Sequence, residues 1–183
     1  ELILCKTCES GKQSLKNGAA ACDSCPAGRY GDNCDACAKG QYRERKGNEE
    51  TADKCDLCPE GYFNEVEGST LCIGCQPGTF QNQKGKNKCD ECDSGKYRDD
   101  ADDDNNDATR CEYCLLGETS NNGSASCTQC TAGLYGSSVG QCTECPTGWT
   151  QDSVGETQCI KCTQGKSFTK VEKACLPCDL GKY

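Results

Sequence analysis

The sequence has no histidine, no methionine, one tryptophan and three phenylalanines in 183 residues. Histidine is the commonest general base and a common metal ligand, and no serine or cysteine nucleophile stands beside another base. The sequence therefore offers no catalytic site, and we expect a protein that is not an enzyme. No apolar run approaches the roughly 20 residues of a membrane-spanning helix, so direct insertion of this segment into a membrane is not expected.

Basic residues are fewer than acidic residues. The chain has 20 lysine and arginine residues against 29 aspartate and glutamate residues, which gives a formal net charge of -9. An acidic chain repels the phosphate backbone of nucleic acids, so we expect no nucleic-acid partner.

Hydrophobic residues are too few for a large buried core. They make up 34% of the chain, and 22 of them are cysteines. Stability must therefore have another source. A loop of about 15 residues closed by a disulfide contributes on the order of 3 kcal/mol in the chain-entropy model. The cysteine content is typical of a disulfide scaffold in an oxidising compartment, which means the outside of the cell or the cell surface.

The cysteines form a repeated motif, of which Cys72 to Phe80 is a clean copy. All 22 fall into C-x-x-C pairs, and in every pair a glycine stands three residues after the second cysteine. In seven copies an aromatic residue follows two positions later. We predict one continuous array of about eleven repeats over residues 1–183, a segment of a longer chain, with motifs that begin at residues 5, 22, 34, 55, 72, 89, 111, 127, 142, 159 and 175.

Each repeat is expected to be a small irregular hairpin. In residues 61–75 the pattern predicts a strand over Tyr62–Glu67, a turn at Gly68-Ser69 and a returning strand over Thr70–Cys72. No segment has helical periodicity over enough length. The predicted fold class is thus small disulfide-rich repeats that form an elongated rod of short irregular β-hairpins, with little regular secondary structure and no helix of note.

Eleven C-x-x-C pairs favour disulfides over two other chemistries. A redox motif would occur once or twice at the start of a helix. Zinc sites take four cysteines each, and eleven pairs leave a remainder. A bond within one C-x-x-C is strained, so the bonds should connect different motifs.

Two connectivities remain open from the residues alone. One links the motifs in twos, first cysteine to first and second to second. The other joins the second cysteine of each motif to the first of the next and leaves Cys5 and Cys178 with partners outside the array. Its pairs are Cys8–Cys22, Cys25–Cys34, Cys37–Cys55, Cys58–Cys72, Cys75–Cys89, Cys92–Cys111, Cys114–Cys127, Cys130–Cys142, Cys145–Cys159 and Cys162–Cys175.

The motif resembles the ephrin-receptor-like cysteine-rich repeat of large extracellular proteins and the first, single-disulfide module of tumour necrosis factor receptors. Cys25-Pro26-Ala27-Gly28-Arg29-Tyr30, followed by Cys34 and Cys37, is similar to that pattern. Cysteine-rich surface antigens of protozoa also look like this. The resemblance implies an elongated ladder of disulfide-closed loops and supports the second connectivity. The denser module with which receptor ectodomains alternate this one is missing here, which argues against a death receptor.

Two further motifs are candidate sites. Within the acidic stretch 99–107, Asp102, Asp104 and Asn106 alternate as calcium ligands would. The turn glycine is replaced by Asp107 and the twelfth position is Tyr113, so a solvated acidic loop without a cofactor is the favoured interpretation. The one N-glycosylation sequon is Asn122-Gly123-Ser124.

The aromatic residues after the motif glycines could stack on a ligand, but we expect each to pack against a disulfide. The sequence thus predicts an extracellular structural protein that forms a disulfide-stabilised rod, fibre or surface coat. Its partners would be neighbouring copies of itself or adjoining repeats. The alternative is a receptor or adhesion ectodomain that binds a protein through its longer loops, residues 43–54 and 98–110.

Overall fold

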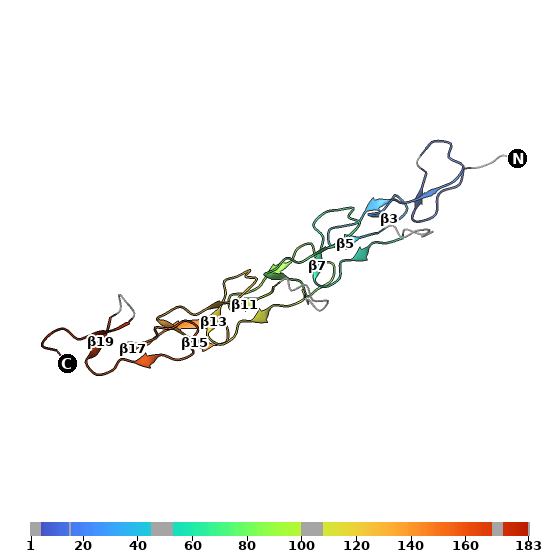
Figure 1. The fold of residues 1–183 in the computed structure, drawn as a ribbon. Helices are drawn as coiled ribbons and strands as arrows, with labels where there is room; N and C mark the ends of the chain where they lie inside the picture. The colour runs from blue at the N-terminus through green and yellow to red at the C-terminus, as the bar shows by residue number, and fades with distance from the viewer. Residues whose placement is uncertain (1–4, 15, 45–52, 100–107, 170–173, 183) are drawn as a thin grey trace. The chain divides into compact units, whose positions relative to one another are not determined.

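The structure is a computed structural model, and it describes residues 5–14, 16–44, 53–99, 108–169 and 174–182. These residues contain short strands, turns and bends and no helix (Figure 1). The predicted fold class of small disulfide-rich repeats is confirmed. The chain divides into two compact units, which are described separately. Unit 1 comprises Glu1–Cys75, Phe80–Asp90 and Asp107–Arg110, and unit 2 comprises Gln76–Thr79, Glu91–Asn106 and Cys111–Tyr183.

Most strands are only two residues long, because each hairpin is short and its second strand leads directly into the next cysteine. The strands are β1 (Lys12–Gln13), β2 (Asp23–Ser24), β3 (Arg29–Tyr30), β4 (Asp35–Ala36), β5 (Gln41–Tyr42), β6 (Asp56–Leu57), β7 (Tyr62–Phe63), β8 (Ile73–Gly74), β9 (Thr79–Phe80), β10 (Asp90–Glu91), β11 (Lys96–Tyr97), β12 (Glu112–Tyr113), β13 (Glu118–Thr119), β14 (Thr128–Gln129), β15 (Leu134–Ser138), β16 (Gln141–Glu144), β17 (Trp149–Thr150), β18 (Ile160–Lys161), β19 (Lys166–Thr169) and β20 (Ala174–Pro177).

Within each unit, strands pair antiparallel with the next strand along the chain. Unit 1 contains the pairs β1–β2, β3–β4, β5–β6 and β7–β8. Unit 2 contains the pairs β11–β12, β13–β14, β15–β16, β17–β18 and β19–β20. In every pair the aromatic position of the motif lies at or next to the second residue of the first strand, so the glycine directly precedes the hairpin.

The predicted boundaries of the hairpin at residues 61–75 were wrong. The first strand ends at Phe63, and the returning strand is Ile73–Gly74. The cause is Asn64, whose side chain accepts a hydrogen bond from the backbone nitrogen of Val66 at 3.0 Å and donates one to the carbonyl of Val66 at 2.9 Å. This local turn takes the chain out of the ladder, because an asparagine side chain competes with the strand for backbone partners.

The core consists of cysteine side chains. The hydrophobic residues that are buried among the described ones are all cysteines: Cys25, Cys34, Cys37, Cys58, Cys75, Cys92, Cys114 and Cys130. The six described aromatic residues of the motif are only half-buried: Tyr30, Tyr42, Phe63, Phe80, Tyr97 and Tyr135. Each repeat therefore closes around its disulfides instead of around an aliphatic centre.

Candidate functional site

A recurring pair of backbone hydrogen bonds, which we call the junction, closes the base of each hairpin and joins it to the next. In the first bond, the second cysteine of a motif donates its N–H to the carbonyl of the glycine of the preceding motif. Cys58 bonds to Gly40 at 2.9 Å in this way, and Cys92 bonds to Gly78 at 2.8 Å. The bond occurs ten times, with the donors Cys25, Cys37, Cys58 and Cys75 in unit 1 and Cys92, Cys114, Cys130, Cys145, Cys162 and Cys178 in unit 2.

The second bond of the junction runs from the N–H of a motif glycine to the residue that follows the aromatic position in the next repeat. Gly28 donates to the carbonyl of Arg43 at 2.8 Å and Gly40 donates to that of Asn64 at 2.7 Å. In unit 2, Gly78 donates to Arg98 at 2.7 Å. Each of these glycines therefore uses its C=O at the base of its own hairpin and its N–H to bond to the next one.

The residue that follows the aromatic position forms a column of buried polar side chains. Its members are Arg43, Asn64 and Gln81 in unit 1 and Arg98, Ser120 and Gln151 in unit 2. The side chains donate to main-chain carbonyls: Arg43 Nη1 to Cys25, Pro26 and Arg29 at 3.2, 3.1 and 2.9 Å, and Asn64 Nδ2 to Gln41 at 2.7 Å. Loops rich in turns leave carbonyls without a ladder partner, and these side chains satisfy them.

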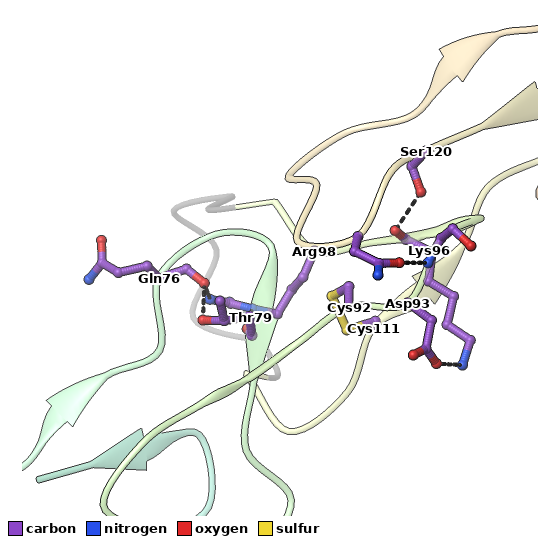
Figure 2. Close-up of a disulfide and its surroundings, with 10 residues drawn as sticks. Gln76, Thr79, Cys92, Asp93, Lys96, Arg98, Cys111 and Ser120 are labelled. Carbon is purple, nitrogen blue, oxygen red and sulfur yellow. Dashed lines mark hydrogen bonds and ion pairs between the residues drawn. A yellow bond between two sulfur atoms is a disulfide. The ribbon is translucent and has the colours of Figure 1, made fainter. Parts of the chain in front are cut away.

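Figure 2 shows this arrangement beside the Cys92–Cys111 disulfide. Arg98 reaches back along the chain, where Nε donates to the carbonyl of Thr79 at 2.5 Å and Nη2 to that of Gln76 at 2.8 Å. In the following repeat, Ser120 Oγ donates to the carbonyl of Lys96 at 2.7 Å. Arg43, Asn64, Arg98 and Ser120 of the polar column therefore each connect a repeat to the one before it, whereas Gln81 and Gln151 donate to Lys88 and Gln158 within their own repeats.

Sequence reasoning missed the polar column, although a signal was present. The residue after the aromatic position is Arg43, Asn64, Gln81, Arg98 and Gln151 in five of the repeats, all of them polar side chains with amide or guanidinium donors. Such side chains are ordinarily exposed to solvent, whereas here they are the donors that an irregular main chain lacks.

The structure joins ten cysteine pairs, which are those of the second connectivity, from Cys8–Cys22 to Cys162–Cys175. The bonded cysteines have Cα atoms between 5.3 Å (Cys25–Cys34) and 5.8 Å (Cys8–Cys22) apart. This is the usual separation for a disulfide, so the loops close without displacement of the backbone. Cys5, which is exposed, and Cys178, which is half-buried, are free thiols within this chain.

The candidate calcium ligands Asp102, Asp104 and Asn106 lie outside the described residues, as does most of the loop 43–54. Among the described residues, no group of three or more histidine, cysteine, aspartate or glutamate side chains is arranged to hold a metal ion. The calcium loop therefore stays a prediction from the sequence.

Unit 1 carries an open groove of about 340 Å³. Two tyrosine rings, a proline and a leucine line it together with one carboxylate, and its residues are Tyr42, Glu44, Pro59, Tyr62, Thr70, Leu71 and Cys72. Leu71 is 58% exposed and Tyr62 is 45% exposed, so the apolar walls are open to solvent. Such walls with a single carboxylate can accept an apolar or cationic side chain of a protein.

One tyrosine of unit 2 has an unusual titration. Burial of the ring, and then the negative charges of Glu112 and Asp99, raise the pKa of Tyr97 above its usual value of about 10. The phenol Oη also lies 3.4 Å from Glu112 Oε2. All these causes favour the protonated phenol in the folded state.

We therefore expect Tyr97 to ionise at a higher pH than an unperturbed tyrosine. In an alkaline absorbance titration with both free thiols alkylated, part of the tyrosinate signal should appear at higher pH, and Tyr97→Phe should remove that phase. The raised pKa contributes stability that is fully present below pH about 10 and is lost as the pH rises through the folded-state pKa. A wild-type titration that superimposes on that of Tyr97→Phe after scaling would contradict this assignment.

These features define a class: a chain of tandem cysteine-rich repeats that are held by disulfides and by main-chain junctions. Disulfides of this number are characteristic of proteins outside the cell or at its surface. Within the part of the chain that the structure describes, no helix has the length and apolar character needed to cross a lipid bilayer.

Comparison with known protein families gives a match over part of the chain. The family model described as "Tyrosine-protein kinase ephrin type A/B receptor-like" matches residues 61–105 and 117–155. The two matched segments together make up less than half of the chain, and they confirm the resemblance of the motif to ephrin-receptor-like cysteine-rich repeats. A comparison with curated proteins gave no significant match. The protein thus carries a cysteine-rich domain of extracellular type, located outside the cell or at the cell surface.

Proposed function

We propose that the chain is an extracellular structural protein whose repeats build a disulfide-stabilised rod, fibre or surface coat. The observation that carries the proposal is the junction between repeats. Among the described residues, the bond from cysteine N–H to glycine carbonyl closes ten hairpins, and the bond from glycine N–H to the next hairpin recurs beside it at Gly28, Gly40 and Gly78, all between main-chain atoms. A structure that repeats one contact gains length without a growing core, which suits a spacer or filament.

The covalent closure supports the same role. Ten disulfides close loops with sequence separations from 9 to 19 residues. Such closure opposes unfolding where no chaperone is available and proteases are present. In this proposal the partners are neighbouring copies or adjoining repeats, and the chain has no catalytic role.

A second candidate function is that of a receptor or adhesion ectodomain, and the groove lined by Tyr42 and Tyr62 favours it. Glu44 lines the groove and belongs to the loop 43–54, which the sequence suggested as a binding loop. A partner that presents a cationic side chain beside an apolar one would complement the carboxylate and the two rings.

Electron microscopy of the native material under non-reducing conditions tests the proposal. We expect long regular fibres or an ordered surface layer built from this chain, since repeated junctions favour repeated assembly. Dispersed particles of single-chain mass, which remain dispersed at high concentration, would contradict assembly into a fibre or coat and would leave a spacer or a receptor arm. They would direct the search to a partner for the groove, with Tyr62→Ala as the variant that abolishes its capture.

A further inference from the structure

The tips of five hairpins share one backbone feature. A glycine with positive φ, between +69° and +75°, stands four residues before the next cysteine: Gly18, Gly68, Gly85, Gly123 and Gly155. The residue directly before it is exposed in all five hairpins: Asn17, Glu67, Lys84, Asn122 and Val154. Because this position holds a carboxylate, an ammonium, an amide or an aliphatic group in different repeats, its side chain is not required for packing. The position before the tip glycine therefore has room for a bulky group.

Asn122 occupies this position in the hairpin of β13 and β14. Its Oδ1 accepts a hydrogen bond from the backbone nitrogen of Ser94 at 2.7 Å, which fixes the amide plane against the preceding repeat. An amide oxygen that accepts from N–H leaves the amide nitrogen on the other side. A substituent on Nδ2 would therefore keep the hydrogen bond to Ser94.

The backbone around Asn122 is held as well. Gly123 donates its N–H to the carbonyl of Cys92 at 2.8 Å, and Ser124 accepts from the N–H of Arg98 at 3.3 Å. Both bonds use main-chain atoms and leave the Asn122 side chain outside the junction. Of the residues that precede the five tip glycines, only Asn122 is an asparagine with serine or threonine two positions later.

We propose that Asn122 is a modification site that carries an N-linked oligosaccharide. In the transfer, a bond forms between Asn122 Nδ2 and the anomeric carbon of the first sugar. The bond from that carbon to the diphosphate of a lipid-linked oligosaccharide donor breaks, the lipid diphosphate leaves, and the amide nitrogen loses one proton. The inference uses the extracellular location and is independent of the structural role proposed above.

The competing explanation is that Asn122 is present for the turn and for its bond to Ser94 alone. Three variants separate the two. Ser124→Ala removes the sequon and keeps the Asn122 amide together with the backbone carbonyl of residue 124. Asn121→Gln alters an exposed neighbour outside the sequon. Ala19→Ser creates a second sequon, which begins at Asn17 and lies at the equivalent hairpin tip of unit 1.

The test is the intact mass of the full chain secreted from eukaryotic cells, before and after treatment with peptide-N-glycosidase. Wild type and Asn121→Gln should each lose one oligosaccharide, with Asn122 converted to aspartate. Ser124→Ala should show the unmodified mass, and Ala19→Ser should lose two oligosaccharides. Wild-type chain secreted without sugar, from cells that modify a reference glycoprotein, would overturn the proposal. An oligosaccharide that persists in Ser124→Ala would overturn the assignment to Asn122.

Discussion

Replacement of Gly40 by alanine is expected to destabilise unit 1 by about 2–5 kcal/mol. Gly40 has φ +79°, and a left-handed backbone costs an L-residue roughly 1–2 kcal/mol. A Cβ at this position would also overlap the carbonyl group of Gly85. That carbonyl is main chain, so it has no rotamer by which to move aside, and overpacking adds about 1–3 kcal/mol.

Gly18→Ala is the matched control. Gly18 has φ +75°, but a Cβ there would have none of the described atoms within 4 Å. It should cost only the backbone penalty of roughly 1–2 kcal/mol. The difference between the two variants therefore isolates the packing of one repeat against another.

Amide hydrogen exchange with the disulfides intact is the appropriate measurement, because unfolding of a repeat array need not be two-state. In Gly40→Ala the amides that bond across the junction, Gly40 to Asn64 and Cys58 to Gly40, should lose protection first. Equal loss of protection in Gly40→Ala and Gly18→Ala would show that the close approach of Gly40 to Gly85 has no energetic role.

Arg43→Met is expected to cost about 2–4 kcal/mol in the same unit. Arg43 is 6% exposed, and its guanidinium donates to three carbonyls at 2.9 to 3.2 Å. Methionine fills similar space but has no donor. The carbonyl of Cys25, whose bond is buried, then loses its partner at about 1–3 kcal/mol, and the part-buried carbonyls of Pro26 and Arg29 lose theirs at a smaller cost. Removal of a buried charge recovers part of that free energy, which keeps the total below the sum.

The control is Arg29→Met, on the exposed side of the neighbouring hairpin. Arg29 makes one bond, from Nη1 to the carbonyl of Cys34 at 3.0 Å, and its side chain faces solvent. We expect a change below about 1 kcal/mol, as for most surface substitutions. The readout is protection of the Gly28 amide, which donates to the carbonyl of Arg43. If Arg43→Met left this protection at the wild-type level, the polar column would not stabilise the junction.

The fold class was predictable because two signals agree in every repeat. The C-x-x-C pair fixes where a loop must close, and the glycine three residues later marks a backbone position with positive φ, where at Gly40 a side chain would also be obstructed. Chain composition pointed the same way, since an ordinary hydrophobic core could not be assembled. The absence of helix among the described residues and the ephrin-receptor-like match over residues 61–105 and 117–155 agree with that prediction.

Two things could not be read from the sequence. The limits of a strand depend on where a side chain takes the backbone hydrogen-bond partners that the strand would use. Asn64 ends β7 after two residues for that reason. The polar column depends on which carbonyls the neighbouring repeat leaves open, as Arg98 shows with Thr79 and Gln76. The recurring polar residue after the aromatic position was visible in the sequence. Local residue patterns describe one repeat at a time, so they do not show which carbonyls of another repeat that residue reaches.

The junctions have a consequence for how such a protein can change over generations. Their donors and acceptors are main-chain atoms, as between Cys130 N–H and Gly117 C=O at 2.8 Å, so these bonds require no particular side chain in the repeat that follows. Duplication or loss of one whole repeat by recombination would recreate the same bonds on both sides of the change. We therefore expect the number of repeats to vary more readily than the length of the C-x-x-C-x-x-G unit, in which an added residue would move the glycine away from its bonding partners.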